Sequence, residues 1–307
     1  MSPIHPNILD AIGRTPLVAL HRLAPSNGSR ILLKVEAGNP TGSMKDRMAL
    51  AMIEAAEASG RLQPGGFVVE YTGGSTGVSL ALICAVKGYP LRIVTSDAFA
   101  REKLDHMRIL GAELQVVRSE GGGMTERLTR EMVEAAGRIA EQPGSFWTDQ
   151  LNNTDQLAAY ETLATEIWEQ TGGAVDAFVQ SVGTAASFRG TAEALRRRDG
   201  PIRLVAVEPA ESPVLSGGNP GAHRIDGIGA GFVVPLWRKD LADDIERVST
   251  EEATAMCGRL AREEGLFAGT STGANVVAAL RLAERLEPGA TLVTVMCDTG
   301  IKYLSKL

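Results

Sequence analysis

Three segments rich in Gly, Ser and Thr carry residue types that bind anions. They span 71–77, 182–187 and 268–273, and each is expected to follow a strand directly and to open a helix. A helix N-terminus presents unpaired backbone N–H groups and a partial positive charge, which suit a phosphate or a carboxylate. A single segment of this kind is usually a tight turn with a Ser or Thr cap. Three of them at the carboxyl ends of strands in one sheet system favour a ligand site.

A fourth segment places a lysine between a turn and a helix start. It spans 39–47 and reads Asn-Pro-Thr-Gly-Ser-Met-Lys-Asp-Arg. Ser43 can cap the helix, and Asp46 suits the first helical turn. A cationic lysine is disfavoured at a helix N-terminus, so we expect Lys45 to be neutral or bound as an imine.

The sequence lacks the signatures of several other chemistries. No Gly-rich segment fits the Gly-x-Gly-x-x-Gly dinucleotide pattern with an acidic residue about 20 positions on, or a Walker loop. The histidines show no metal-ligand spacing and no serine partner, so structural roles are expected for His5, His21, His106 and His223. The cysteines have no Cys-x-x-Cys spacing and an odd count, which indicates a reducing compartment for Cys84, Cys257 and Cys297. We therefore expect a cytoplasmic protein in which Cys297 is a buried free thiol.

Composition indicates a soluble globular protein of one large domain or two smaller ones. The chain has 307 residues, with 44% hydrophobic and 22% charged residues and a formal net charge of −6. This mildly acidic balance gives no electrostatic reason to expect nucleic acid or an anionic membrane as a partner. The longest apolar stretches fall short of the roughly 20 residues of a spanning helix, and no signal peptide is expected.

Short apolar runs alternate with helical patterns along the whole chain. The residue pattern predicts strands at 31–35, 67–70, 91–94, 114–117, 177–179, 204–207 and 292–295. It predicts helices at about 46–59, 75–87, 100–110, 124–141, 154–170, 185–198, 250–264 and 274–286. The Gly- and Pro-rich segment 212–230 is predicted to be a long loop. Such alternation is typical of parallel sheets covered on both faces, and two such halves indicate an α/β protein of two doubly wound domains with a cleft between them.

The segment around Lys45 resembles the cofactor-lysine motif of fold-type II pyridoxal-phosphate enzymes. Within that group the chain is most similar to cysteine synthase (O-acetylserine sulfhydrylase) and its cystathionine β-synthase relatives. The resemblance covers nearly the whole chain in the right order. It includes Ile12-Gly-Arg-Thr-Pro-Leu17, Lys34-x-Glu36, the Lys45 motif, the Thr72 loop, Gln150, the Gly183 loop, Gly227-Ile-Gly-Ala-Gly-Phe232, the Ser271 loop and Asp298-Thr-Gly-x-x-Tyr-Leu-Ser305.

The resemblance implies pyridoxal 5'-phosphate as cofactor and assigns roles to individual residues. Lys45 would bind the cofactor covalently and move the α-proton of the substrate. The cofactor phosphate would be held by Gly183, Thr184, Ala185, Ala186 and Ser187. Ser271 would bond the pyridine nitrogen, and Ser75 would lie near the cofactor's 3′-oxygen. The substrate would be bound by Thr72, Gly73, Ser75, Thr76, Gln150 and Gly227.

The implied reaction is β-replacement on an O-activated serine, through an α-aminoacrylate, with a sulfur nucleophile that gives cysteine or a close analogue. A neutral Ser271 hydroxyl leaves the pyridine nitrogen unprotonated, which favours β-elimination or replacement over transamination. The implied fold is that of the tryptophan synthase β-subunit. It has a smaller mobile domain at 40–148 that closes on the substrate, and a larger phosphate-binding domain at 1–39 plus 149–307. A homodimer is also implied, with an amino acid and a sulfur donor as the small-molecule partners.

Two loops depart from the usual family pattern. The common Thr-Ser-Gly-Asn-Thr-Gly loop reads Thr-Gly-Gly-Ser-Thr-Gly at 72–77, so that Ser75 replaces the family asparagine with a shorter side chain. The common Gly-Thr-Gly-Gly-Thr loop reads Gly-Thr-Ala-Ala-Ser at 183–187, which puts methyl groups where glycine permits unusual dihedrals. We expect the phosphate still to bind, because N–H donors and hydroxyls remain.

Three alternatives stay open at this stage. The leaving group can be acetate, phosphate or hydroxide, and Arg224 in the loop before Gly227 is a candidate for recognising a phosphate. A serine or threonine dehydratase would release the eliminated product without adding sulfur. A protein of another class would have the same fold but no catalysis, and would bind an amino acid or a partner.

Overall fold

The computed structural model describes residues 4–119 and 125–306, and the chain divides into two compact units. Unit 1 is built from the chain up to Gly13, from Asn39–Gln156 and from the chain after Ile301. Unit 2 is built from Arg14–Gly38 and Leu157–Ile301. In the described ranges no helix is both long and apolar enough to cross a membrane.

These bounds differ from the expected 40–148 and 1–39 plus 149–307, for reasons visible in hydrogen bonds. The Gly13 N–H donates to Asn39 Oδ1 over 2.8 Å, which ties the N-terminal segment to unit 1. The Ser305 hydroxyl donates to Glu102 Oε2 over 2.7 Å, which ties the C-terminal segment to the same unit. Gln156 Nε2 donates to the Gln150 carbonyl over 2.8 Å, so unit 1 continues past residue 148.

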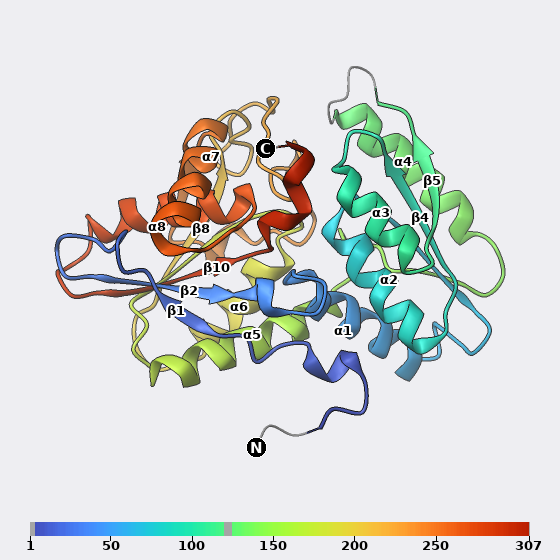
Figure 1. Ribbon diagram of the computed structural model, residues 1–307, viewed down its shortest axis with the longest axis horizontal. Helices are drawn as coiled ribbons and strands as arrows, with labels where there is room; N and C mark the ends of the chain where they lie inside the picture. Colours follow the sequence, from blue (N-terminus) through green and yellow to red (C-terminus); the bar gives the residue numbers. More distant parts are fainter. Residues whose placement is uncertain (1–3, 120–124, 307) are drawn as a thin grey trace. The chain divides into compact units, whose positions relative to one another are not determined.

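Unit 1 is a parallel sheet with helices on both faces, as Figure 1 shows. Its order is β5-β4-β3-β6, formed by β3 (Phe67–Tyr71), β4 (Leu91–Ser96), β5 (Glu113–Val117) and β6 (Ser145–Trp147). Its helices are α1 (Lys45–Ala58), α2 (Ser75–Lys87), α3 (Arg101–Ile109) and α4 (Glu126–Ala140). Because side chains alternate along a strand, Val68 and Ile93 pack with α1, α2 and α3, whereas Val69 and Val94 pack with α4.

Unit 2 is a six-stranded sheet in the order β1-β2-β10-β7-β8-β9. The strands are β1 (Leu17–Ala19), β2 (Arg30–Val35), β7 (Ala177–Ser181), β8 (Arg203–Pro209), β9 (Asp244–Val248) and β10 (Thr291–Met296). The helices are α5 (Gln156–Thr171), α6 (Ala186–Arg196), α7 (Thr250–Arg259), which continues as a π-helix at Leu260–Glu264, and α8 (Thr270–Ala283). One face packs on α7 and α8, and α5 and α6 lie on the other face (Figure 1).

The α/β class with two doubly wound units is confirmed, and the long loop at 212–230 contains no helix or strand. Three short strands were not predicted, namely β1, β6 and β9. The prediction of purely parallel sheets was wrong at one edge, since β1 runs antiparallel to β2. The connection between these two strands is too short for the crossover that a parallel pair needs. The predicted start of the 124–141 helix, Met124, lies outside the described residues.

Candidate functional site

Lys45 is the first residue of α1, and the turn before it is fixed by a buried carboxyl group. The Lys45 N–H donates to Ser43 Oγ over 3.2 Å. Asp46 is fully buried and accepts hydrogen bonds from the Thr41 N–H, over 2.8 Å, and from the hydroxyls of Thr41 and Ser79, each over 2.5 Å. Burial raises the pKa of Asp46. Since Ser79 lies on α2, this network fixes the start of α1, and with it the backbone of Lys45, against α2.

The segment at 72–76 lies where β3 ends and α2 begins, as predicted. Its two glycines are required by their neighbours. A Cβ at Gly73 would lie 2.1 Å from the Phe99 ring, and a Cβ at Gly74 would lie 2.4 Å from the Lys103 side chain. A side chain at position 73 would therefore require the Phe99 ring to move.

Gln150 joins this segment through its side chain. The Thr76 hydroxyl donates to Gln150 Oε1 over 2.8 Å, and Gln150 Nε2 donates to the Tyr71 carbonyl over 2.9 Å. Six of the predicted residues therefore lie in unit 1, where hydrogen bonds connect α1, α2 and the turn after β6. They are Lys45, Thr72, Gly73, Ser75, Thr76 and Gln150.

The other predicted residues lie in unit 2, where the 183–187 segment is packed against the Gly227 loop. A Cβ at Gly183 would lie 2.3 Å from the Gly227 carbonyl oxygen. The Gly229 N–H donates to the Val182 carbonyl over 3.1 Å. Gln180 Nε2 donates to the Ser187 hydroxyl over 3.0 Å, which fixes that side chain at the start of α6. The structure thus brings Gly183–Ser187 and Gly227 together.

Ala185 adopts a backbone conformation that normally favours glycine. Its φ is 70°, in the left-handed region, and it is the N-cap of α6. A non-glycine residue there costs roughly 1–2 kcal/mol. The Gly-to-Ala departure at this position therefore places a methyl group on a strained backbone, while Ala186 has entered the helix.

The segment at 268–273 was wrongly predicted to follow a strand directly. It follows the π-helix and a single β-bridge between Ala268 and Thr299, and α8 already begins at Thr270. Ser271 is therefore a buried residue of the first turn of α8. The Asp226 N–H donates to Thr270 Oγ1 over 3.0 Å, so the start of α8 adjoins the Gly227 loop.

The helices that begin at predicted ligand segments share one property. The N-cap residues of α2, α6 and α8, which are Gly74, Ala185 and Gly269, make no side-chain capping bond. By contrast, the side chains of Thr125 and Ser249 cap α4 and α7. The first turn of α3 also lacks a side-chain cap, at Ala100, so this property is not confined to the ligand segments. A helix N-terminus is nevertheless a suitable place for an anion.

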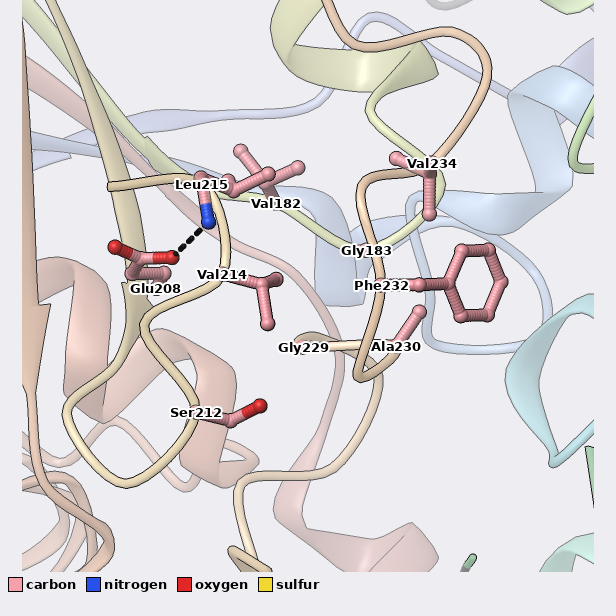
Figure 2. Close-up of a pocket in the computed structure, with 10 residues that line it drawn as sticks. All are labelled: Val182, Gly183, Glu208, Ser212, Val214, Leu215, Gly229, Ala230, Phe232 and Val234. Carbon is pink, nitrogen blue, oxygen red and sulfur yellow. Dashed lines mark hydrogen bonds between the residues drawn. The ribbon is translucent and has the colours of Figure 1, made fainter. Parts of the chain in front are cut away.

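The donor set at 183–187 fits the phosphate of pyridoxal phosphate. It consists of the uncapped first turn of α6 and the hydroxyls of Thr184 and Ser187, with no carboxyl group in the segment. A small pocket behind Gly183 contains the carboxyl group of Glu208 (Figure 2). That group accepts from the Leu215 N–H over 2.7 Å, so its charge is engaged by the 212–216 loop.

Three further residues, Cys297, His223 and Arg224, have different surroundings. Cys297 is buried and reduced, as predicted, and its N–H donates to Thr272 Oγ1 over 3.1 Å. His223 contacts the Gly229 carbonyl over 2.9 Å, and Arg224 is exposed. Over residues 4–119 and 125–306, no group of three or more His, Cys, Asp or Glu side chains is arranged to hold a metal ion.

Glu70 was not singled out from the sequence, yet its fully buried carboxyl group accepts a hydrogen bond from the backbone of Gln150. It accepts from the Gln150 N–H over 3.0 Å and from the Thr148 hydroxyl over 2.5 Å. Burial raises its pKa from 4.5 to about 7. A glutamate inside the strand sequence Phe-Val-Val-Glu-Tyr was the available signal, because a charged residue in a buried strand needs partners.

This pKa predicts how stability depends on pH. The folded state holds the Glu70 proton more tightly than the unfolded state, so the contribution of this group to stability declines as pH rises from 4.5 to about 7. Over this pH range the contribution of Glu70 to the free energy of unfolding falls by about 3 kcal/mol. Urea unfolding of wild type and Glu70→Gln, each at pH 5 and at pH 7.5, measures this pH dependence of the free energy of unfolding. The free energy of unfolding should fall more steeply with pH in wild type, and parallel curves would contradict the assignment.

Comparison with known proteins identifies the family. Residues 8–298 match the family described as "Pyridoxal-phosphate dependent enzyme". The chain is 42% identical to a probable cysteine synthase of Bacillus subtilis, over 99% of this chain and 98% of that protein.

Solved structures agree with the family match. A cysteine synthase from Entamoeba histolytica superposes with a TM-score of 0.92 at 36% identity, over 99% of this chain and 91% of that one. An O-acetylserine dependent cystathionine β-synthase from Helicobacter pylori gives a TM-score of 0.91 at 36% identity, over 100% and 99% of the two chains. The chain belongs to the family of pyridoxal-phosphate dependent enzymes, in its cysteine synthase branch.

Proposed function

We propose that the protein replaces the β-substituent of an O-activated serine with a sulfur nucleophile and so forms cysteine or a close analogue. The family match and the cysteine synthase relatives support this reaction. The observation that carries the proposal is Lys45 at the start of α1, fixed by Asp46 against α2, where the substrate segment begins.

Lys45 is the residue that holds the cofactor's aldehyde group and later moves the substrate's α-proton at its Nζ atom. The hydrogen bond to Ser43 and the burial of Asp46 fix the backbone of Lys45 at the start of α1. The position from which its side chain extends is therefore well defined. When bound, the cofactor withdraws electrons from the α-carbon of the substrate so that the β-substituent can leave.

The residues of unit 2 hold the two ends of the cofactor ring system. The segment Gly183–Ser187 binds the phosphate through N–H groups of α6 and through hydroxyls. Ser271, in the first turn of α8, would hold the pyridine nitrogen through its hydroxyl. Because a hydroxyl is neutral and cannot protonate that nitrogen, it favours loss of a β-substituent over transamination.

The residues of unit 1 bind the substrate carboxylate. Thr72, Gly73, Ser75 and Thr76 supply hydroxyls and the uncapped N–H groups of α2, and Gln150 is bonded to Thr76. Gly227, in its own loop of unit 2, is the remaining residue that we propose for substrate binding. Ser75 has a shorter side chain than the asparagine common in the family, so it reaches the cofactor's 3′-oxygen less directly.

The test is turnover by the purified protein loaded with pyridoxal phosphate. O-acetylserine, O-phosphoserine and serine are each offered with sulfide, with homocysteine, or with no nucleophile, and the products are identified by mass spectrometry. We expect cysteine from an O-activated serine and sulfide. Pyruvate as the main product in the presence of sulfide would favour a dehydratase. No turnover of any amino acid would favour a binding protein.

The same experiment also determines which sulfur nucleophile the protein uses. The Helicobacter pylori relative is named for cystathionine synthesis from O-acetylserine, so homocysteine is included as an alternative to sulfide. Cystathionine formation at a higher kcat/KM than cysteine formation would move the assignment to that reaction.

A further inference from the structure

We propose that Glu70 is a positioning residue that holds Gln150, and through it Thr76, in the geometry of the substrate carboxylate site. The inference rests on the proposed function, because it concerns the segment that binds the carboxylate there. Glu70 itself lies inside the sheet and contacts no part of the substrate, so it acts through other residues.

Both oxygens of Glu70 accept hydrogen bonds from the backbone. Oε1 accepts from the Tyr71 N–H over 2.8 Å. Oε2 accepts from the Gln150 N–H over 3.0 Å and from the Thr148 hydroxyl over 2.5 Å. The two N–H groups can only donate, both to the carboxylate and to the acid that forms below the raised pKa, whose proton the Thr148 hydroxyl can accept. The site therefore requires a side chain with two acceptor atoms.

The turn that Glu70 holds is strained. Asp149, between Thr148 and Gln150, has a φ of 43°, in the left-handed region that a non-glycine residue adopts only when its surroundings impose it. The bonds from residues 148 and 150 to Glu70 impose it from both sides. Loss of the Gln150 bond would let the turn relax and would move the Gln150 side chain.

The Gln150 side chain transmits this constraint to α2. Its Oε1 accepts from Thr76, and its Nε2 donates to the Tyr71 carbonyl. The bond to Tyr71 fixes the orientation of the amide, since a reversed amide would place its oxygen against the Tyr71 carbonyl oxygen, and the Thr76 hydroxyl then donates to Oε1. A continuous set of bonds thus runs from Glu70 to the second residue of α2, which belongs to the substrate segment.

Glu70→Gln tests the inference because glutamine keeps the shape but has one acceptor oxygen. Whichever way its amide is oriented, the NH₂ group faces either the Tyr71 N–H or the Gln150 N–H. We expect KM for O-acetylserine to rise about tenfold, while KM for sulfide and kcat change less than threefold. Glu57→Gln is the matched control, because Glu57 bonds Lys87 and Tyr89 at the far end of α1, and it should leave both KM values unchanged.

A double-mutant cycle separates positioning from a general loss of structure. Gln150→Ala should raise KM for O-acetylserine, and adding Glu70→Gln to it should change KM no further. Thr148→Val should raise KM and Thr148→Ser should restore it. As a readout apart from activity, amide exchange in the peptide with Gln150 should accelerate in Glu70→Gln.

The outcomes distinguish this inference from the proposed function. If wild type turns over O-acetylserine and Glu70→Gln leaves its KM unchanged, or if the two KM effects multiply in the double variant, the positioning role is wrong. If wild type turns over no O-activated serine, the proposed function fails, and unchanged amide exchange at Gln150 in Glu70→Gln would then overturn the positioning role separately.

Discussion

Replacing Lys45 with alanine is expected to lower kcat for cysteine formation by at least about 10³-fold. The Lys45 amine is the group that holds the cofactor and moves the α-proton, and no other lysine begins an α-helix among the α-helices that the structure describes. The donors at 183–187 remain, so the variant should still bind pyridoxal phosphate by its phosphate group. Its absorption spectrum should be that of free cofactor rather than of lysine-bound cofactor.

Lys87→Ala is the control for the loss of a lysine. Lys87 lies at the end of α2 and pairs with Glu57 over 2.7 Å, on the surface and away from the substrate segment. It should retain wild-type activity within about twofold, because a surface ion pair contributes little. Should Lys45→Ala keep more than a tenth of wild-type kcat, another amine does the chemistry.

Gly183→Ala is expected to raise the dissociation constant of pyridoxal phosphate by about 10- to 100-fold. The added Cβ would lie 2.3 Å from the Gly227 carbonyl oxygen, which is a backbone atom that cannot rotate away. Either the phosphate segment or the Gly227 loop must then move. Binding is measured by fluorescence titration of the apoenzyme, and the gain in Tm on adding cofactor should shrink.

Gly137→Ala is the matched control for this substitution. Gly137 lies inside α4, and an added Cβ would lie 3.7 Å from Trp147, an ordinary contact. This variant should bind the cofactor as wild type does and be slightly more stable, because alanine is the better helix former. Equal cofactor affinity in Gly183→Ala and wild type would show that the phosphate is bound elsewhere.

Much of the fold could be predicted because local patterns determine it. The helix predicted at 75–87 is α2 to the residue, since apolar periodicity begins at Ser75 and Gly88 ends it with a φ of 79°. The strands β1 and β6 have three residues each, too few for a pattern, and β9 (Asp-Ile-Glu-Arg-Val) has only two apolar residues, so all three were missed. Their pairing depends on partners far along the chain, such as the pairs between β9 and β8.

The candidate site was found by its loops but not by what supports them. Lys45 and the segment at 72–76 carry distinctive spacing. Glu70 and Asp46 do not: the charged Glu70 in an apolar strand signals that partners are needed, but the sequence does not show which donors surround either acid in the fold. The strain at Ala185 was equally hidden, because the sequence cannot show that this alanine has a φ of 70°.

Covalent attachment of pyridoxal phosphate to one lysine, Lys45, underlies every role proposed for the site. Holoenzyme is treated with borohydride, digested, and mapped by mass spectrometry. The account predicts a reduced pyridoxyl-phosphate adduct on the peptide with Lys45 and on no other. An adduct on a different lysine, or an unmodified Lys45 in protein saturated with cofactor, would contradict it.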